Sequence, residues 1–81
     1  FRWLKLPKLK ILVIRGVEKE NYQEEIETKL GEMGIQIRDV SIDSDENNNK
    51  KYTFNIEMPQ DITEESIVSE FPYHVSLKSG S

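Results

Sequence analysis

The sequence has no cysteine, a single histidine and no apolar run long enough to form a membrane span. Without cysteine, a disulfide framework, a thiol nucleophile and a thiolate metal site are excluded. A spanning helix needs about 20 predominantly apolar residues, and a signal peptide needs an apolar segment behind a basic start. We therefore expect that these 81 residues neither span a membrane nor carry a signal peptide.

Positive charge is scarce outside the first ten residues. Residues 1–10 carry four Lys or Arg residues and no acid, whereas the rest of the chain carries seven against 15 Asp or Glu residues. An acidic body repels phosphate backbones, so nucleic acid is not an expected partner. Residues 50–54 (KKYTF) echo the basic-aromatic segment of RNA-recognition motifs, but the glycine at its second position is missing.

Residues 1–7 (FRWLKLP) combine aromatic, leucine and cationic side chains, and Pro7 breaks any helix. Trp and Phe favour the headgroup layer of a membrane, and Lys and Arg collect on its cytoplasmic side. Two interpretations stay open: a juxtamembrane segment, or an arm that packs Trp3 on its own domain. Because the chain starts at Phe1 rather than Met, we expect a fragment of a longer protein, with a linker arm at 1–7 and one domain at 8–79.

The most apolar stretch, residues 9–14 (LKILVI), predicts a strand buried on both faces at the centre of the sheet. Five further periodic segments follow it: a helix at 21–33, strands at 35–42 and 52–58, a helix at 63–71 and a strand at 73–77. Within residues 35–42 the alternation changes parity near Arg38 and Asp39, which indicates a β-bulge. This order predicts an α+β, ferredoxin-like βαββαβ sandwich. Its four-stranded antiparallel sheet has the first and third strands in the middle and two helices on one face.

Local signals set the ends of the first predicted helix. Asn21 is the expected N-cap, with Glu24 reaching back to it as in a capping box. Glu25 and Lys29 have the spacing of an i,i+4 ion pair. Gly34 is expected to end the helix in the left-handed conformation.

The second predicted helix has its own start signal. Thr63 is the expected N-cap, and Ile62 with Ile67 has the spacing of a hydrophobic staple. Its expected buried stripe is Ile67, Val68 and Phe71.

The strand, turn and amphipathic helix ending in Gly-Ile-Gln-Ile (34–37) resemble the start of ACT-type regulatory domains. With the basic-aromatic start and the closing His-Val-Ser-Leu (74–77), residues 8–78 resemble the cytoplasmic C-terminal domain of MgtC/SapB-family membrane proteins. The resemblance implies a soluble ACT-like domain on the cytoplasmic side of the cell membrane. It also implies attachment to the membrane only through a preceding part absent from this sequence, and a link to magnesium limitation.

Few residues suggest chemistry. The segment 43–48 (DSDENN) resembles the start of an EF-hand loop, but Asn48 and Phe54 stand where that loop requires glycine and a bidentate acid. A solvated hairpin loop and no metal site are therefore expected. His74 lies on the polar side of an edge strand, and no nucleophile accompanies a base, so we expect neither an enzyme nor a cofactor.

ACT domains that bind amino acids often carry an Asp-x-Pro-Gly-like turn after the first strand, and residues 15–20 (RGVEKE) keep only its glycine. If a small molecule binds, Arg15 and Gly16 are the expected contacts, because they offer a cation and an approachable backbone at one turn. The alternative is that Gly16 only permits the turn.

A strand that is apolar on both faces of a one-sheet domain leaves one of its two apolar sets without cover from the helices, either Leu9, Ile11 and Val13 or Leu12 and Ile14. Exposed patches of this kind commonly mark interaction sites. We therefore expect a non-enzymatic regulatory domain that forms a homodimer or contacts its own membrane part. The rival interpretation is a soluble ACT-type sensor of a small molecule such as an amino acid, and the sequence preceding Phe1 distinguishes the two.

Overall fold

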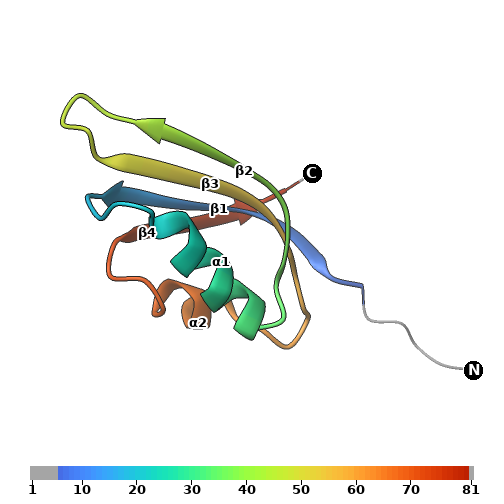
Figure 1. The fold of residues 1–81 in the computed structure, drawn as a ribbon. Coiled ribbons are helices and arrows are strands. Elements are labelled where there is room, and N and C mark those ends of the chain that lie inside the picture. Colours follow the sequence, from blue (N-terminus) through green and yellow to red (C-terminus); the bar gives the residue numbers. More distant parts are fainter. Residues whose placement is uncertain (1–5, 81) are drawn as a thin grey trace, which may run out of the picture.

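The computed structural model describes residues 6–80, so most of the arm predicted at 1–7 lies outside the described residues. Six elements follow in order: β1 (Lys8–Val17), α1 (Tyr22–Glu32), β2 (Gln36–Ser44), β3 (Lys50–Met58), α2 (Glu64–Val68) and β4 (His74–Ser79). The strand order is β2-β3-β1-β4 with every neighbouring pair antiparallel, which places the first and third strands at the centre as predicted. Figure 1 shows α1 and α2 beneath the same face of the sheet. The ferredoxin-like α+β fold is confirmed.

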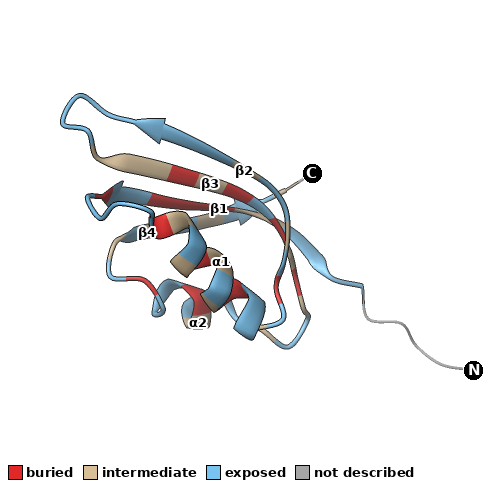
Figure 2. Cartoon of the chain, viewed as in Figure 1, coloured by how far each residue is buried: buried red, intermediate tan, exposed pale blue. Residues whose placement is uncertain are grey.

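The core fills the space between the helices and one face of the sheet. Leu12 and Ile14 of β1 are fully buried and lie opposite Phe54 and Tyr52 of β3. The other buried members of this core are Val17, Tyr22, Ile26, Leu30, Ile35, Ile56, Met58, Ile67 and Phe71. In Figure 2 the buried residues gather on β1, β3 and the helices, whereas β2 is almost entirely exposed.

Two bulges interrupt the strand pairing. The register between β2 and β3 shifts between Ile37 and Asp39, which confirms the bulge predicted from the change of parity. A second shift falls between Ile14 and Val17 of β1, where the sequence predicts a turn. The predicted turn is wrong, because Gly16 adopts a φ of 74° and lets the strand continue through Val17 past an extra residue.

The C-terminal end of α1 is a Schellman motif around Gly34. The backbone N–H of Gly34 donates to the carbonyl of Gly31 at 3.0 Å, and that of Ile35 donates to the carbonyl of Leu30 at 3.0 Å. The φ of Gly34 is 77°, a value that glycine adopts without steric cost. The prediction for Gly34 is confirmed.

The N-terminal half of α1 differs from expectation. Asn21 has a left-handed backbone (φ 57°, ψ 35°) and makes no side-chain capping bond, so the predicted capping box is wrong. A capping side chain needs extended backbone to reach the first-turn N–H groups. The predicted Glu25–Lys29 pair is wrong too, because the Glu25 Oε1 lies 2.7 Å from Lys19 Nζ while Lys29 Nζ lies 3.9 Å from a carboxylate oxygen of Glu70.

Helix α2 is shorter than predicted but starts as expected. The Thr63 hydroxyl accepts a hydrogen bond from the backbone N–H of Ser66 at 3.2 Å, which confirms its capping role. Ile67 and Phe71 are buried, whereas Val68 is 41% exposed. Consecutive helical residues point about 100° apart, so Val68 turns away from the core that Ile67 enters.

Candidate interaction surface

The sheet has one face without helices among the described residues, and we call it the open face (Figure 1). The strand registers and alternation assign its members: Leu9, Ile11, Val13, Arg15, Gln36, Arg38, Asp39, Ser41, Asp43, Lys51, Thr53, Asn55, Glu57, His74, Ser76 and Lys78. Sixteen side chains of mixed character therefore form one continuous surface.

Residues that pair across neighbouring strands lie side by side on one face, so the registers divide the open face into rows. One row, the charged row, runs from β2 to β4 as Asp39, Asn55, Ile11 and Lys78. The next row, the small row, runs as Ser41, Thr53, Val13 and Ser76. The charged row ends in an acid on one edge strand and a base on the other, and the small row carries no charge.

The apolar patch on this face is smaller than the sequence suggests. Val13 is only 7% exposed, Ile11 is half-buried and Leu9 is 38% exposed. Val13 lies directly between Thr53 and Ser76, and these neighbours cover much of a β-branched side chain that stands upright between them. The open face is therefore mostly polar, with a narrow apolar line along β1.

Its charges are partly paired within the chain. Arg38 Nε lies 3.5 Å from Glu57 Oε2 across the β2–β3 pair. Asp39 and Lys78 are exposed and take part in no ion pair among residues 6–80. A hollow of about 430 Å³ lies over the charged row, and its lining includes Asp39, Asn55 and Ile11 of that row together with Leu9 and Gly80.

Gly80 closes this hollow on the β1 side. Its backbone N–H donates to the carbonyl oxygen of Leu9 at 2.9 Å, and a Cβ built at Gly80 would lie 3.3 Å from the Leu9 carbonyl carbon. Glycine thus allows the chain to lie tightly against β1 at this point.

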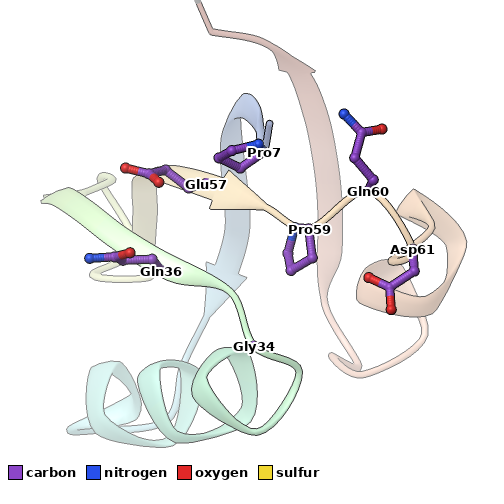
Figure 3. A pocket seen from close by; sticks show the side chains of 7 residues that line it. All are labelled: Pro7, Gly34, Gln36, Glu57, Pro59, Gln60 and Asp61. Atoms are coloured by element: carbon purple, nitrogen blue, oxygen red, sulfur yellow. The ribbon is translucent and has the colours of Figure 1, made fainter. Parts of the chain in front are cut away.

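A second hollow of about 430 Å³ lies at the end of the sheet where the chain enters β1 (Figure 3). The side chains of Gln36 and Glu57 stand on one side of it and those of Gln60 and Asp61 on the other (Figure 3). The Gln60 side-chain amide donates to the carbonyl oxygen of Leu6. The connection between β3 and α2 therefore holds the entering segment in place.

The two sequence-predicted ligand contacts lie at the opposite end of β1. Arg15 is exposed and lies opposite His74, the sole histidine, which is exposed as expected. Gly16 has nothing within 4 Å of a Cβ built on it, so its positive φ is sufficient reason for glycine. Neither Arg15 nor Gly16 lines either hollow described above, and their role in binding stays a prediction.

The hairpin loop between β2 and β3 is organised by one aspartate. The Asp45 Oδ1 accepts backbone N–H bonds from Asn47 at 2.9 Å and from Asn49 at 2.8 Å, and Asn48 adopts a φ of 63°. Such bonds are typical of an Asx-stabilised turn. No group of three His, Cys, Asp or Glu residues within the described part of the chain could hold a metal ion.

A cluster of tyrosines, not anticipated from the sequence, lies in the core near the start of α1. The Tyr22 ring meets Tyr73 edge to face at a centroid distance of 5.1 Å and Tyr52 at 6.5 Å. The Tyr22 hydroxyl is buried and has no hydrogen-bond partner among residues 6–80. Burial raises the pKa of Tyr22, and the nearby Glu25 carboxylate and Tyr73 add to the rise.

Lys19 covers this cluster from the solvent side. Its Nζ lies 5.7 Å from the centroid of the Tyr22 ring, within the range of a cation–π contact. The hydrogen bond from Lys19 to Glu25 raises the pKa of the ammonium group. Lys19, Tyr22 and Glu25 thus pack together at the start of α1, and none of them lines either hollow described above.

No protein-family model and no curated protein matches the sequence. A search of solved structures finds similarity to the solution structure of the C-terminal domain of the MgtC protein from Mycobacterium tuberculosis, with a TM-score of 0.67 and 19% identity. The match covers 99% of this chain and 94% of that domain. No helix in residues 6–80 is long and apolar enough to cross a membrane. The part of the chain that the structure describes therefore has a fold similar to that of the C-terminal domain of MgtC.

Proposed function

We propose that this chain is a non-catalytic regulatory domain of an MgtC/SapB-like membrane protein linked to magnesium limitation. It acts on the cytoplasmic side of the membrane, by self-association or by contact with its own membrane part. The observation that carries the proposal is the extent of the structural match, which covers 99% of this chain and 94% of the MgtC domain. Almost all of each domain is therefore matched by the other, which supports a common architecture.

The open face and the entry to β1 suit such a role. An accessory domain must hold the segment that joins it to the rest of the protein, and here Gln60 fixes the backbone of Leu6. It must also present a surface to a partner, and the open face lacks cover from the helices (Figure 1). The sensor interpretation has less support, because Arg15 and Gly16 line neither of the two hollows described.

The proposal is tested first by reading the coding sequence upstream of Phe1. Hydrophobic segments of about 20 residues there support the membrane-protein interpretation, whereas a soluble catalytic domain favours the small-molecule sensor and contradicts it. The second test deletes residues 8–79 from the longer protein and measures growth in limiting magnesium. We expect a growth defect that magnesium supplementation relieves, and unchanged growth of the deletion strain would contradict the role.

A further inference from the structure

We infer that the hollow at the entry to β1, which we call the entry hollow (Figure 3), binds residues 1–5 of this same chain. Trp3 is seated in the hollow, and Lys5 pairs with Asp61 at its rim. The inference adds to the proposed function, because it says how the domain holds the segment that precedes it, and it does not depend on that function. It also selects the second of the two interpretations of residues 1–7, an arm that packs on its own domain.

The described chain begins at the edge of the entry hollow. Pro7 is part of the lining, and the carbonyl oxygen of Leu6 accepts a hydrogen bond from the Gln60 side-chain amide. A chain advances at most about 3.6 Å per residue, so the Cα atom of Trp3 lies within about 11 Å of that of Leu6. A hollow that Pro7 lines is therefore within reach of residues 1–5.

Leu6 leaves the entry hollow open for another occupant. Its side chain is 71% exposed, and Leu6 is not part of the lining. Proline restricts the residue before it to extended backbone, and successive side chains of an extended backbone point to opposite sides. Lys5 is therefore expected on the side away from Leu6, which is the side of Pro7 and of the hollow.

The lining of the entry hollow is acidic. Besides the amides of Gln36 and Gln60 it contains the carboxylates of Glu57 and Asp61, and none of the described residues that form it is Lys or Arg (Figure 3). Glu57 Oε2 already lies 3.5 Å from Arg38 Nε. Asp61 is exposed and takes part in no ion pair among residues 6–80. A cation that enters the hollow thus meets the Asp61 carboxylate.

Residues 1–5 (FRWLK) supply that cation. They carry two basic side chains and no acid. Lys5 directly precedes Leu6, and Asp61 directly follows Gln60, so the hydrogen bond between Gln60 and Leu6 brings the two backbones together beside this pair. Opposite charges on adjoining segments favour the docked arrangement.

Trp3 matches the apolar part of the same lining. Pro7 and Pro59 stand in it (Figure 3), and the volume of about 430 Å³ falls within the range of about 300–1,000 Å³ of sites that hold small molecules. The N–H group of a buried indole usually has a hydrogen-bond partner, and the Gln36 side chain offers a carbonyl oxygen in this lining.

The entry hollow suits this segment better than the hollow over the charged row does. That other hollow has Lys10 and Arg38 in its lining, which would oppose Arg2 and Lys5. Residues 1–5 also have an advantage over a separate molecule, because tethering by a few residues gives an effective concentration in the millimolar range.

The test reads the fluorescence of Trp3, the single tryptophan of the sequence, in the chain of residues 1–81. We expect its emission to be blue-shifted from that of N-acetyltryptophanamide and its quenching by acrylamide to be weaker. In NMR spectra, Trp3→Ala should move the amide resonances of Gly34 and Gln36 and leave those of the hairpin residues 43–49 in place. A Trp3 as exposed as the free compound overturns the inference, as do unmoved resonances of Gly34 and Gln36.

A charge swap tests the pairing of Lys5 with Asp61. Lys5→Glu and Asp61→Lys should each lower the ratio of docked to free segment, calculated from acrylamide quenching, by up to about fivefold, the effect of an exposed ion pair. The double variant should restore the ratio to within about twofold of the parent. Circular dichroism checks that each variant folds.

The matched control is Asp43→Lys. Asp43 is exposed, takes part in no ion pair within the described part of the chain and lies at the other end of β2 from Gln36. This substitution makes the same change in net charge and should leave quenching as in the parent. A double variant no better than the singles, or a control that acts like Asp61→Lys, overturns the pairing.

Vesicles that contain phosphatidylglycerol separate docking on the domain from binding to a membrane. A Trp3 that is exposed in the isolated chain and protected only when these vesicles are added assigns residues 1–5 to the membrane surface; it overturns the inference and leaves the proposed function in place. A Trp3 protected in the isolated chain, together with growth that ignores deletion of residues 8–79 from the longer protein, keeps the docking and removes the link to magnesium.

Discussion

The two faces of the sheet are built from the same strands and differ in burial and in polarity. On β3 the residues that face the helices are Tyr52, Phe54, Ile56 and Met58, all buried, and those between them are Lys51, Thr53, Asn55 and Glu57, none buried. The core face is held by apolar burial, which the screening of charges by salt does not weaken. The open face offers charges and hydroxyls in register, which contribute little until a partner covers them.

The comparison also separates stability from recognition. A residue of the core face acts through the volume it fills, and removing that volume costs stability. A residue of the open face acts through what it presents to a second molecule, so its loss is expected to change association and not folding. Substitutions at neighbouring positions should therefore have unrelated effects.

The sharpest test of this difference changes adjacent residues of β3. Phe54→Ala removes a fully buried ring and is expected to lower the free energy of unfolding by about 3–5 kcal/mol. Thr53→Ala, one residue away on the open face, should change it by less than about 0.5 kcal/mol. Urea denaturation measures both. Similar losses at the two positions would mean that the open face is part of the core.

A second test concerns the C-terminal end of α1, one of the two helices that cover the core face of the sheet. Gly34→Ala forces an L side chain into a φ of 77° and is expected to cost about 1 kcal/mol. Gly31→Ala, inside α1 with open space around its Cβ position, should raise stability by up to about 1 kcal/mol. Thermal unfolding of the two variants should thus shift in opposite directions. A shift in the same direction would contradict the assignment of Gly34 to the end of α1.

A third test asks what a polar atom does on the core face. The Tyr22 hydroxyl has no hydrogen-bond partner within the described part of the chain, so Tyr22→Phe should leave the free energy of unfolding unchanged or raise it by up to about 1 kcal/mol. Urea denaturation at pH 7 measures this value. A loss of more than about 1 kcal/mol would reveal a hydrogen-bond partner for the hydroxyl.

The pH dependence of stability in the same variant tests the environment of Tyr22 independently. The pKa of Tyr22 is raised in the folded chain above its ordinary value of 10.0, so the unfolded chain loses this proton first as the pH rises. The resulting stability is fully present below pH 10 and is lost as the pH climbs through the folded pKa. Tyr22→Phe should flatten part of the alkaline decline in stability. If stability declines identically at alkaline pH in the parent chain and in Tyr22→Phe, other titrating groups cause the decline.

The smallest expected effect is on the acids of the β2–β3 loop. Because the Asp45 carboxylate already accepts two backbone N–H bonds, calcium or magnesium at about 1 mM should leave the amide resonances of residues 43–49 nearly unmoved. Saturable shifts confined to this loop at micromolar metal would contradict that expectation. The same titration reports on Asp39 and Asp43 of the open face.

Much of the fold could be predicted because periodicity is a local signal. Alternation located the strands, and the change of parity near Arg38 and Asp39 located a bulge that the β2–β3 register confirms. Gly34 was predictable because the residue that ends a helix in the left-handed conformation is usually glycine. These features depend on residues close together in the chain.

Some wrong predictions come from competition between nearby side chains, and others come from contacts between residues far apart in the chain. Glu25 pairs with Lys19 and not with Lys29, and spacing along a helix does not show that competition. The burial of Val13 depends on Thr53 and Ser76, which lie 40 and 63 residues further along the chain. The charged row could not be read from the sequence at all, because its four members come from four strands.

The most direct test of the difference between the two faces is a dilution series followed by NMR. Between about 1 mM and 20 µM chain, we expect concentration-dependent shifts at Ser41, Thr53, Val13 and Ser76 of the small row, and none along α1. This pattern would locate the contact between copies on the open face. Shifts confined to α1, or spectra identical at every concentration, would contradict the account.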